Sequence, residues 1–312
     1  MGTPLLWVGF NLFVLLAVAL DLGVFHRKAR KIQAREAAFW SMAWIATAMF
    51  FGYCVWHWYG AQRGLEYFTG YVIEKSLSVD NLFVFLLIFR AFQVDEQVQH
   101  RVLAWGILGA LVMRGLMIAA GAALIARFHW ILPAFGVFLV YSGAHMLRKR
   151  GKQVQYEKSP IFRFASTHLR VTKEYHGGKF FIRQAGQLLA TPLLLVLIVI
   201  EISDVTFAVD SIPAIFGITR DAFIVYTSNV FAILGLRALY FLLSDLLEYL
   251  RYLGIGLALV LIFIGMKMVA DPWRHIPVSF SLTVVGGILL IATLLSLWKG
   301  PRKESGKNPA VC

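Results

Sequence analysis

Residues 188–211 read LLATPLLLVLIVIEISDVTFAVDS, an apolar run that is interrupted by three carboxylates. A helix needs about 20 residues to cross the hydrocarbon core of a bilayer, so this run is long enough to span it. Acidic side chains are rare inside membranes, where each costs about 2.5–3.5 kcal/mol on insertion scales, and they mark functional sites. The stretch therefore predicts a membrane-spanning helix that carries a binding site.

The composition of the whole chain is also typical of a membrane protein. Of its 312 residues, 59% are hydrophobic and 15% are charged, and the mean hydropathy is +0.70. Soluble domains are about 45–50% apolar, and one soluble core of this size could not bury so much apolar surface. These values exclude a water-soluble enzyme, a disordered chain and a disulfide scaffold, and we expect no enzymatic activity. The two cysteines, Cys54 and Cys312, form no redox or zinc motif.

Nine apolar stretches are long enough to cross a bilayer as helices. They are Leu5–Phe25, Phe39–Trp58, Gly70–Phe89, Val102–Ala126, Trp130–Leu147, Leu188–Ser211, Phe223–Leu243, Tyr252–Ala270 and Ile276–Trp298. The expected fold class is therefore all-α: a polytopic helical membrane protein with about nine transmembrane helices.

The basic residues predict an orientation for these helices. With the N-terminus outside, the cytoplasmic segments hold 22 Lys and Arg residues, whereas the outside segments hold only Arg63, Arg127, Arg220 and Arg274. Lysine and arginine concentrate in cytoplasmic loops, so this orientation is favoured and the C-terminus is cytoplasmic. The net charge of +13 then reflects topology and contact with the headgroups of the lipid bilayer. We expect no nucleic-acid partner.

The chain contains an internal repeat. Residues 74–81, EKSLSVDN, resemble residues 204–211, DVTFAVDS, because each has a carboxylate, five residues, an aspartate and a small amide or hydroxyl residue. The likeness continues at 107–114 against 231–237 and at 143–147 against 265–269. Each copy covers three spans, so the second copy crosses the membrane in the opposite sense. Inverted repeats are typical of transporters, whose substrate sites lie near the membrane midplane.

These features divide the chain into five parts. The parts are two N-terminal transmembrane helices (1–69), a first three-helix repeat (70–147), a basic cytoplasmic loop (148–187), a second, inverted three-helix repeat (188–270), and a last helix with a polar tail (271–312). Within the basic loop, residues 179–189 predict a small hairpin around Gln184-Ala185-Gly186.

Five carboxylates lie inside or at the edges of two predicted spans. They are Glu74, Asp80, Glu201, Asp204 and Asp210. At 100° per residue, Glu74 shares a helix face with Ser78 and Asn81, and Asp204 shares one with Ser211.

Two of these carboxylates, Asp80 and Asp210, lie about 120° away from those faces in a straight helix. They either point elsewhere or converge because the helices unwind locally, which Pro213 favours in the second copy.

The ligands available in this set are all oxygen atoms. Such ligands suit hard divalent ions, which are Mn²⁺, Mg²⁺ or Ca²⁺. The alternative is that the acids form buried structural ion pairs, Asp80 with Arg114 and Asp210 with Arg237. Both can hold at once, with the arginines taking the place of the metal in the empty state. In the seventh span, Asn229 is suited to a hydrogen bond between helices.

Several long motifs indicate a family. Residues 74–85, EKSLSVDNLFVF, and 201–216, EISDVTFAVDSIPAIF, together with segments 2–7, 190–193 and 228–237, resemble signature stretches of the TerC/Alx family of integral membrane proteins, most closely its Alx members. The resemblance implies a bacterial inner (plasma) membrane protein of metal-ion homeostasis. Family members are associated with Mn²⁺ export, with Mn²⁺ supply to exported enzymes and with tellurium resistance, and some are described as redox modulators. The motif residues that carry over are Glu74, Asp80, Asn81, Glu201, Asp204 and Asp210.

The expected function is therefore export of a divalent metal ion, with Mn²⁺ first and Ca²⁺ or Mg²⁺ as further candidates. Protons are a plausible counter-ion, because crowded carboxylates can take up protons once the metal leaves. The rival hypothesis is a membrane scaffold or a redox or metal-stress component without transport, in which the acids are structural. The sequence contains no reactive cysteine pair, haem-ligand pair or flavin motif to support redox chemistry.

Overall fold

The computed structural model describes most of the chain. The described residues are 2–25, 34–128, 130–148, 171–172, 174–184, 187–243, 252–271, 273 and 276–299. Among these, the side chains of residues 21–25, 34, 80 and 243 are not described.

Helices dominate the described chain. In chain order the elements are α1 (Pro4–Phe25), α2 (Ala34–Tyr59), α3 (Ala61–Ala91), α4 (Glu96–Arg127), α5 (Ile131–Arg148), β1 (Phe181–Gln184), β2 (Gln187–Ala190), α7 (Pro192–Phe216), α8 (Ala222–Ile233), α9 (Leu236–Leu243), α10 (Leu253–Ala270) and α11 (Val278–Lys299). Carboxylate caps fix two of the starts: Asp95 accepts a hydrogen bond from a backbone N–H at the start of α4, and Asp221 accepts two at the start of α8.

Among the described residues, seven helical stretches are long and apolar enough to cross a membrane. They are α2, α4, α5, α7, α8 together with α9, α10 and α11. The predicted class, an all-α polytopic membrane protein, is confirmed.

The start of the predicted sixth span was wrong. Residues 188–190 belong to strand β2, and α7 begins at Pro192. Proline suits the first position of a helix, because its missing N–H is one that the helix would leave unpaired there.

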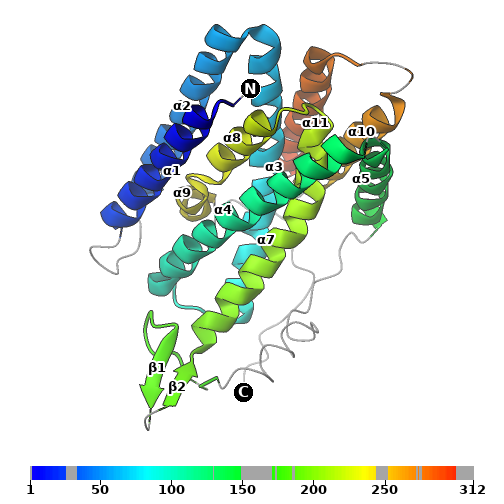
Figure 1. The fold of residues 1–312 in the computed structure, drawn as a ribbon. Helices are drawn as coiled ribbons and strands as arrows, with labels where there is room; N and C mark the ends of the chain where they lie inside the picture. The colour runs from blue at the N-terminus through cyan, green and yellow to red at the C-terminus, as the bar shows by residue number, and fades with distance from the viewer. Residues whose placement is uncertain are drawn as a thin grey trace.

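Helices α4 and α7 run side by side through the middle of the molecule, with α1 and α2 on one side and α5 and α10 on the other (Figure 1). Helix α3 packs against α7 and α8, and α4 also contacts α8. The four helices α3, α4, α7 and α8, which carry most of the predicted site residues, therefore meet one another in the interior.

Glycines allow α5 and α10 to pack closely. A Cβ atom on Gly136 would lie 2.7 Å from the Gly265 carbonyl oxygen, and a Cβ on Gly265 would lie 2.5 Å from the Gly136 carbonyl oxygen. A Cβ on Gly143 would lie 2.6 Å from the Ala258 carbonyl oxygen. Small residues at such contacts let helix backbones approach in membranes, where van der Waals packing drives association.

We expect Gly265→Ala to destabilise the protein by about 1–3 kcal/mol, because the added methyl group overpacks a backbone contact. A lower melting temperature of the purified protein in detergent would measure this. Gly286→Ala is the matched control, since a Cβ there meets no atom within 4 Å. Equal melting temperatures for the two variants would contradict the expectation.

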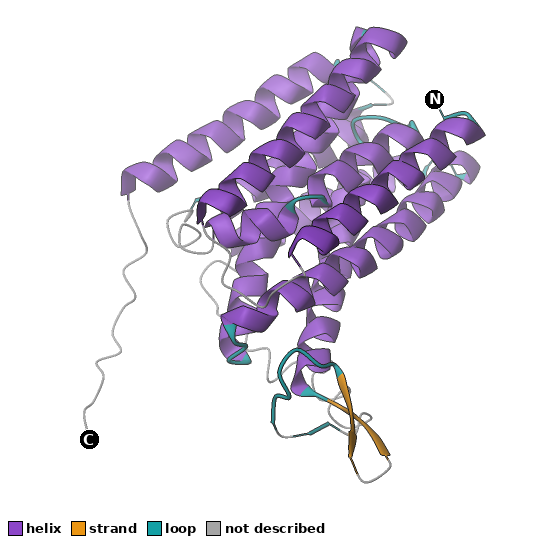
Figure 2. Ribbon diagram, turned by 90° about the vertical axis from the view of Figure 1, so that its left-hand side faces the viewer, coloured by secondary structure: helices purple, strands orange, loops and turns teal. Residues whose placement is uncertain are grey.

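A two-stranded hairpin projects beyond the helices (Figure 2). Its strands are antiparallel, with Phe181 opposite Ala190 and Gln184 opposite Gln187. The hairpin predicted from the sequence is thus confirmed, although residues 185–186 of its turn lie outside the described residues.

The segment before the hairpin is docked on two helix ends. The Tyr175 hydroxyl donates to the Phe92 carbonyl oxygen at 2.7 Å, and Arg101 donates to the Gly178 carbonyl oxygen at 2.8 Å. Burial raises the pKa of Tyr175, so its hydroxyl stays protonated and able to donate. These bonds fix the hairpin beside the end of α3 and the start of α4.

Candidate functional site

A buried arginine joins the predicted acids of the two repeats. Arg114 on α4 is 2% exposed, and its guanidinium contacts Glu74 on α3, Asp204 on α7 and Asn229 on α8. Glu74 lies 13 residues after the start of α3, about 20 Å along a helix of 31 residues. The cluster therefore lies near the middle of the helices.

The guanidinium binds Asp204 with two hydrogen bonds. Its Nε lies 3.1 Å from Asp204 Oδ2, and its Nη2 lies 2.9 Å from Asp204 Oδ1. Its Nη1 donates to Glu74 Oε1 and, at 3.2 Å, to Asn229 Oδ1. A planar fork of donors suits two carboxylates at once, which a lysine ammonium could not match.

Several oxygens beside Arg114 lack hydrogen-bond partners. Asn81 Nδ2 donates weakly to Asp204 Oδ1, at 3.5 Å. Four oxygen atoms on α3 and α7 are buried and accept no hydrogen bond within the described part of the chain. They are Glu74 Oε2, Ser78 Oγ, Asn81 Oδ1 and Ser211 Oγ. Buried polar atoms are nearly always paired in native proteins, so such a group suggests a missing ligand or water.

Two further acids of the set, Glu201 and Asp210, lie outside the Arg114 cluster. Glu201 is half-buried, and its carboxylate lies against Gly109 of α4, where no side chain intervenes. Asp210 is half-buried and accepts a hydrogen bond of 2.9 Å from the Ser142 hydroxyl of α5. Neither acid forms an ion pair with any residue that the structure describes.

The course of α7 explains the position of Asp210. Helix α7 stays helical through Pro213 to Phe216, so no local unwinding turns Asp210 toward Asp204. Asp210 instead points to α5, and the hypothetical Asp210–Arg237 ion pair was wrong. The Asp80 side chain is not described in the structure, so its predicted ion pair with Arg114 stays a prediction.

The interruption expected near Asp210 occurs in the next helix. Helix α8 ends at Ile233 and α9 begins at Leu236, with Gly235 between them at φ +78°. That positive φ is easily adopted only by glycine. A small cavity of about 10 Å³, room for roughly one water molecule, lies beside this break and is lined by Asp204 and Arg237.

In the described part of the chain, no three His, Cys, Asp or Glu side chains are arranged around a common point where they could hold a metal ion. The guanidinium of Arg114 lies between Glu74 and Asp204 instead. The arrangement can therefore hold a cation between the two acids, and in this structure that cation is an arginine side chain.

A second polar region lies where α3 begins, at the opposite end of α3 from the hairpin. A cavity of about 310 Å³ is lined by Glu66, Thr219, Lys267 and Asp271, among other residues. The Glu66 side chain is only 5% exposed although it is ionisable.

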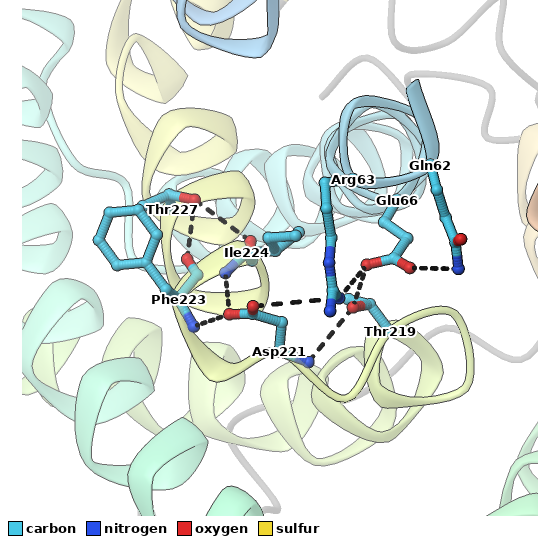
Figure 3. Close-up of polar contacts among 8 residues, drawn as sticks. All are labelled: Gln62, Arg63, Glu66, Thr219, Asp221, Phe223, Ile224 and Thr227. Atoms are coloured by element: carbon cyan, nitrogen blue, oxygen red, sulfur yellow. Dashed lines mark hydrogen bonds and ion pairs between the residues drawn. The ribbon is translucent and has the colours of Figure 1, made fainter. Parts of the chain in front are cut away.

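Figure 3 shows how this carboxylate is held. Glu66 accepts hydrogen bonds from Thr219 at 2.6 Å, Arg63 at 2.9 Å and Gln62 at 3.4 Å. These bonds tie the connection between α7 and α8 to the start of α3.

Sequence reasoning missed Glu66 and Ser142. Glu66 lies close to the predicted third span, and its spacing of three residues from Arg63 is a signal for a helical ion pair that could have identified it. No signal in the sequence distinguishes Ser142 from other serines in spans. Asn229 was predicted to bond between helices, and its bond to Arg114 confirms this.

Comparisons with known proteins support the family resemblance. The sequence profile described as "Integral membrane protein TerC family" matches residues 59–304. An uncharacterized membrane protein of Myxococcus xanthus is 48% identical over 307 residues, covering 97% of this chain and 96% of that protein. The "Putative membrane-bound redox modulator Alx" of Escherichia coli strain K12 is 46% identical over 317 residues, covering 98% of each chain. No solved structure matches significantly.

Proposed function

The chain belongs to the TerC family of integral membrane proteins, and from this membership and the site we propose that it transports divalent metal ions, with Mn²⁺ export from the cytoplasm as its main activity. Ca²⁺ and Mg²⁺ are the competing substrates, since they use the same oxygen ligands. The location that follows is a bacterial inner membrane.

The observation that carries this proposal is the set of buried oxygens without partners. Glu74 and Asn81 on α3 present such oxygens in the Arg114 cluster, Ser78 lies between them on α3, and Ser211 presents one two helical turns beyond Asp204 on α7. Hard divalent cations bind oxygen ligands. Ca²⁺ takes six to eight of them, and Mn²⁺ also suits a shell made only of oxygen atoms. A cation that enters can use these oxygens and the two acids as Arg114 moves aside.

The helix contacts support an inverted repeat. The repeat alignment places Gly143 opposite Gly265, and the same offset places Gly136 opposite Ala258. The two close contacts between α5 and α10 are Gly136 with Gly265 and Gly143 with Ala258. A two-fold axis that relates the two repeats would exchange Gly136 with Ala258 and Gly265 with Gly143, and so would turn each contact into the other. Symmetric interfaces show this reciprocal pattern.

Arg114 lies between the two repeats, as expected for a site on a pseudo-two-fold axis. It binds Glu74 and Asp204, which are equivalent positions of the two repeats. A substrate that binds at this axis is reached from one side when the repeats rock one way and from the other side when they rock back.

The proposed orientation has the N-terminus outside and the C-terminus in the cytoplasm. Two of the four basic residues on the outside are then neutralised by acids: Arg63 pairs with Glu66 at 2.9 Å, and Arg220 pairs with Asp271 at 3.2 Å. The 310 Å³ cavity that contains Glu66 and Asp271 would form the external vestibule. Protons taken up by Glu201 and Asp210 after metal release would be the counter-ions.

The test is Mn²⁺ flux into proteoliposomes, measured with an internal Mn²⁺-quenched dye. We expect flux by the wild type and a loss of about tenfold or more in Asp210→Asn, because the variant removes a charged oxygen near the path. Asparagine keeps an oxygen that can accept the bond from Ser142, so stability should change little. Asp95→Asn, at the exposed start of α4, is the matched control, because asparagine caps a helix as well as aspartate does. Unchanged Mn²⁺ flux in Asp210→Asn would exclude a role of the Asp210 carboxylate in transport.

The name of the Escherichia coli relative favours a second candidate, a redox or stress component without transport. In that case the acids are structural, and Asp210→Asn would lower the yield of folded protein while the wild type would show no Mn²⁺ flux. Folded yield and Mn²⁺ flux, measured on the same purified proteins, therefore distinguish the two candidate functions.

A further inference from the structure

The break between α8 and α9 leaves a helix C-terminus, with its partial negative charge, inside a candidate membrane span. The stretch formed by α8 and α9 is a candidate span, and 89% of the residues in its most apolar window are buried. Helix α8 ends within it because Leu234 is extended, at ψ 132°, and Gly235 has φ +78°. The last carbonyl groups of a helix lack intrahelical partners and carry the negative end of its dipole.

A lysine occupies this negative end. Lys75 Nζ donates to the Ala232 carbonyl oxygen at 3.1 Å, across the contact between α3 and α8. Ala232 is fully buried. Lys75 follows Glu74 directly, yet the Glu74 carboxylate is bound to Arg114, and Lys75 makes no ion pair with any described residue. The ammonium is therefore balanced locally by backbone carbonyl dipoles.

The helix end adjoins the acids of the candidate site. Asn229, which bonds Arg114, precedes Ala232 by three residues, about one helical turn or 4.5 Å along the axis. On both sides of the break, Ile233 and Leu236 line the same small cavity as Asp204. Asp204 and the residues that flank the end of α8 thus line one cavity, beside the carbonyl group that Lys75 occupies.

We propose that the C-terminal end of α8 is a binding subsite for the divalent cation and that the Lys75 ammonium is its tethered competitor. This inference rests on the proposed function. When the metal binds, Lys75 leaves the Ala232 carbonyl, and the freed backbone oxygens become ligands, as unwound carbonyls and half-helix C-termini do for ions in other inverted-repeat transporters. When Lys75 returns, it displaces the metal and so favours release.

The test is equilibrium Mn²⁺ binding to the purified full chain, followed by electron paramagnetic resonance of free Mn²⁺. Lys75→Met has nearly the length of lysine without its charge, and we expect it to bind Mn²⁺ about tenfold or more tightly than the wild type, because a unit charge close to a divalent ion is removed. Its Mn²⁺ flux should be slower, since release loses its competitor. Lys75→Arg, which keeps the charge, should bind within about threefold of the wild type.

Two further measurements keep the outcomes distinct. Lys299→Met removes an exposed lysine at the end of α11, away from both cavities, and should leave the affinity unchanged. Lys75→Gln, which keeps a polar side chain, replaces Lys75→Met if that variant folds poorly. Wild-type binding with equal or weaker binding in both neutral variants overturns the subsite alone. No Mn²⁺ binding by any variant overturns the subsite and the proposed transport function together.

Discussion

Replacement of Arg114 by leucine is expected to destabilise the protein by about 3–5 kcal/mol, which is a large part of the stability of a folded chain. Arg114 is the hydrogen-bond donor that Glu74 and Asp204 share, and both acids are almost fully buried. Removing it leaves two carboxylates close together in the interior without a cation. The yield of monodisperse protein in detergent and its melting temperature measure the loss.

A surface arginine gives the matched control for this variant. The Arg220 side chain is 62% exposed and pairs with Asp271 at 3.2 Å, so Arg220→Leu should change stability by no more than about 1 kcal/mol. Adding Glu74→Gln and Asp204→Asn to Arg114→Leu should restore part of the lost stability, because the uncompensated charges disappear. A wild-type melting temperature for Arg114→Leu alone would show that the cluster contributes little to stability.

Helical periodicity predicted which polar residues share a helix face. Glu74 and Asn81 are seven positions apart, as are Asp204 and Ser211, and all four side chains are buried in the structure. The sequence did not predict which acids Arg114 binds. That choice depends on how α3, α4 and α7 are placed relative to one another, which is a property of tertiary packing.

The break between α8 and α9 could not be predicted from local sequence. The pair Leu234-Gly235 interrupts a helix, yet the equivalent pair Leu108-Gly109 lies inside the continuous helix α4. Both glycines are closely packed, Gly235 against the Trp44 side chain and Gly109 against the Glu201 carboxylate, so close packing alone does not account for the difference. A glycine in an apolar run allows a break, but the local sequence does not determine whether the break forms.

Close packing also explains why a glycine faces Glu201. On α4, a Cβ at Gly109 would collide with the Glu201 carboxylate, so the glycine makes room for this acid between α4 and α7. Gly109→Ala should therefore displace the carboxylate and reduce Mn²⁺ flux severalfold. Gly115→Ala is its control on the same helix, because a Cβ there would be 3.5 Å from Tyr226, an ordinary contact.

Glu201→Gln should cause the largest loss of transport, about a hundredfold or more in Mn²⁺ flux. Loss of outer-shell partners alone weakens metal sites by 10–100-fold, and Glu201 is a carboxylate with no cation bound to it among the described side chains, so it is free to bind the incoming ion. Glutamine has nearly the same shape, and Glu201 forms no hydrogen bond with a described residue that glutamine would have to replace, so the melting temperature should stay close to that of the wild type. The contrast with Arg114→Leu would separate two expected roles, that of an arginine that maintains the fold and that of an unpaired acid that binds the substrate. A Glu201→Gln protein that transports Mn²⁺ normally would remove this acid from the pathway and leave the Arg114 cluster as a structural feature.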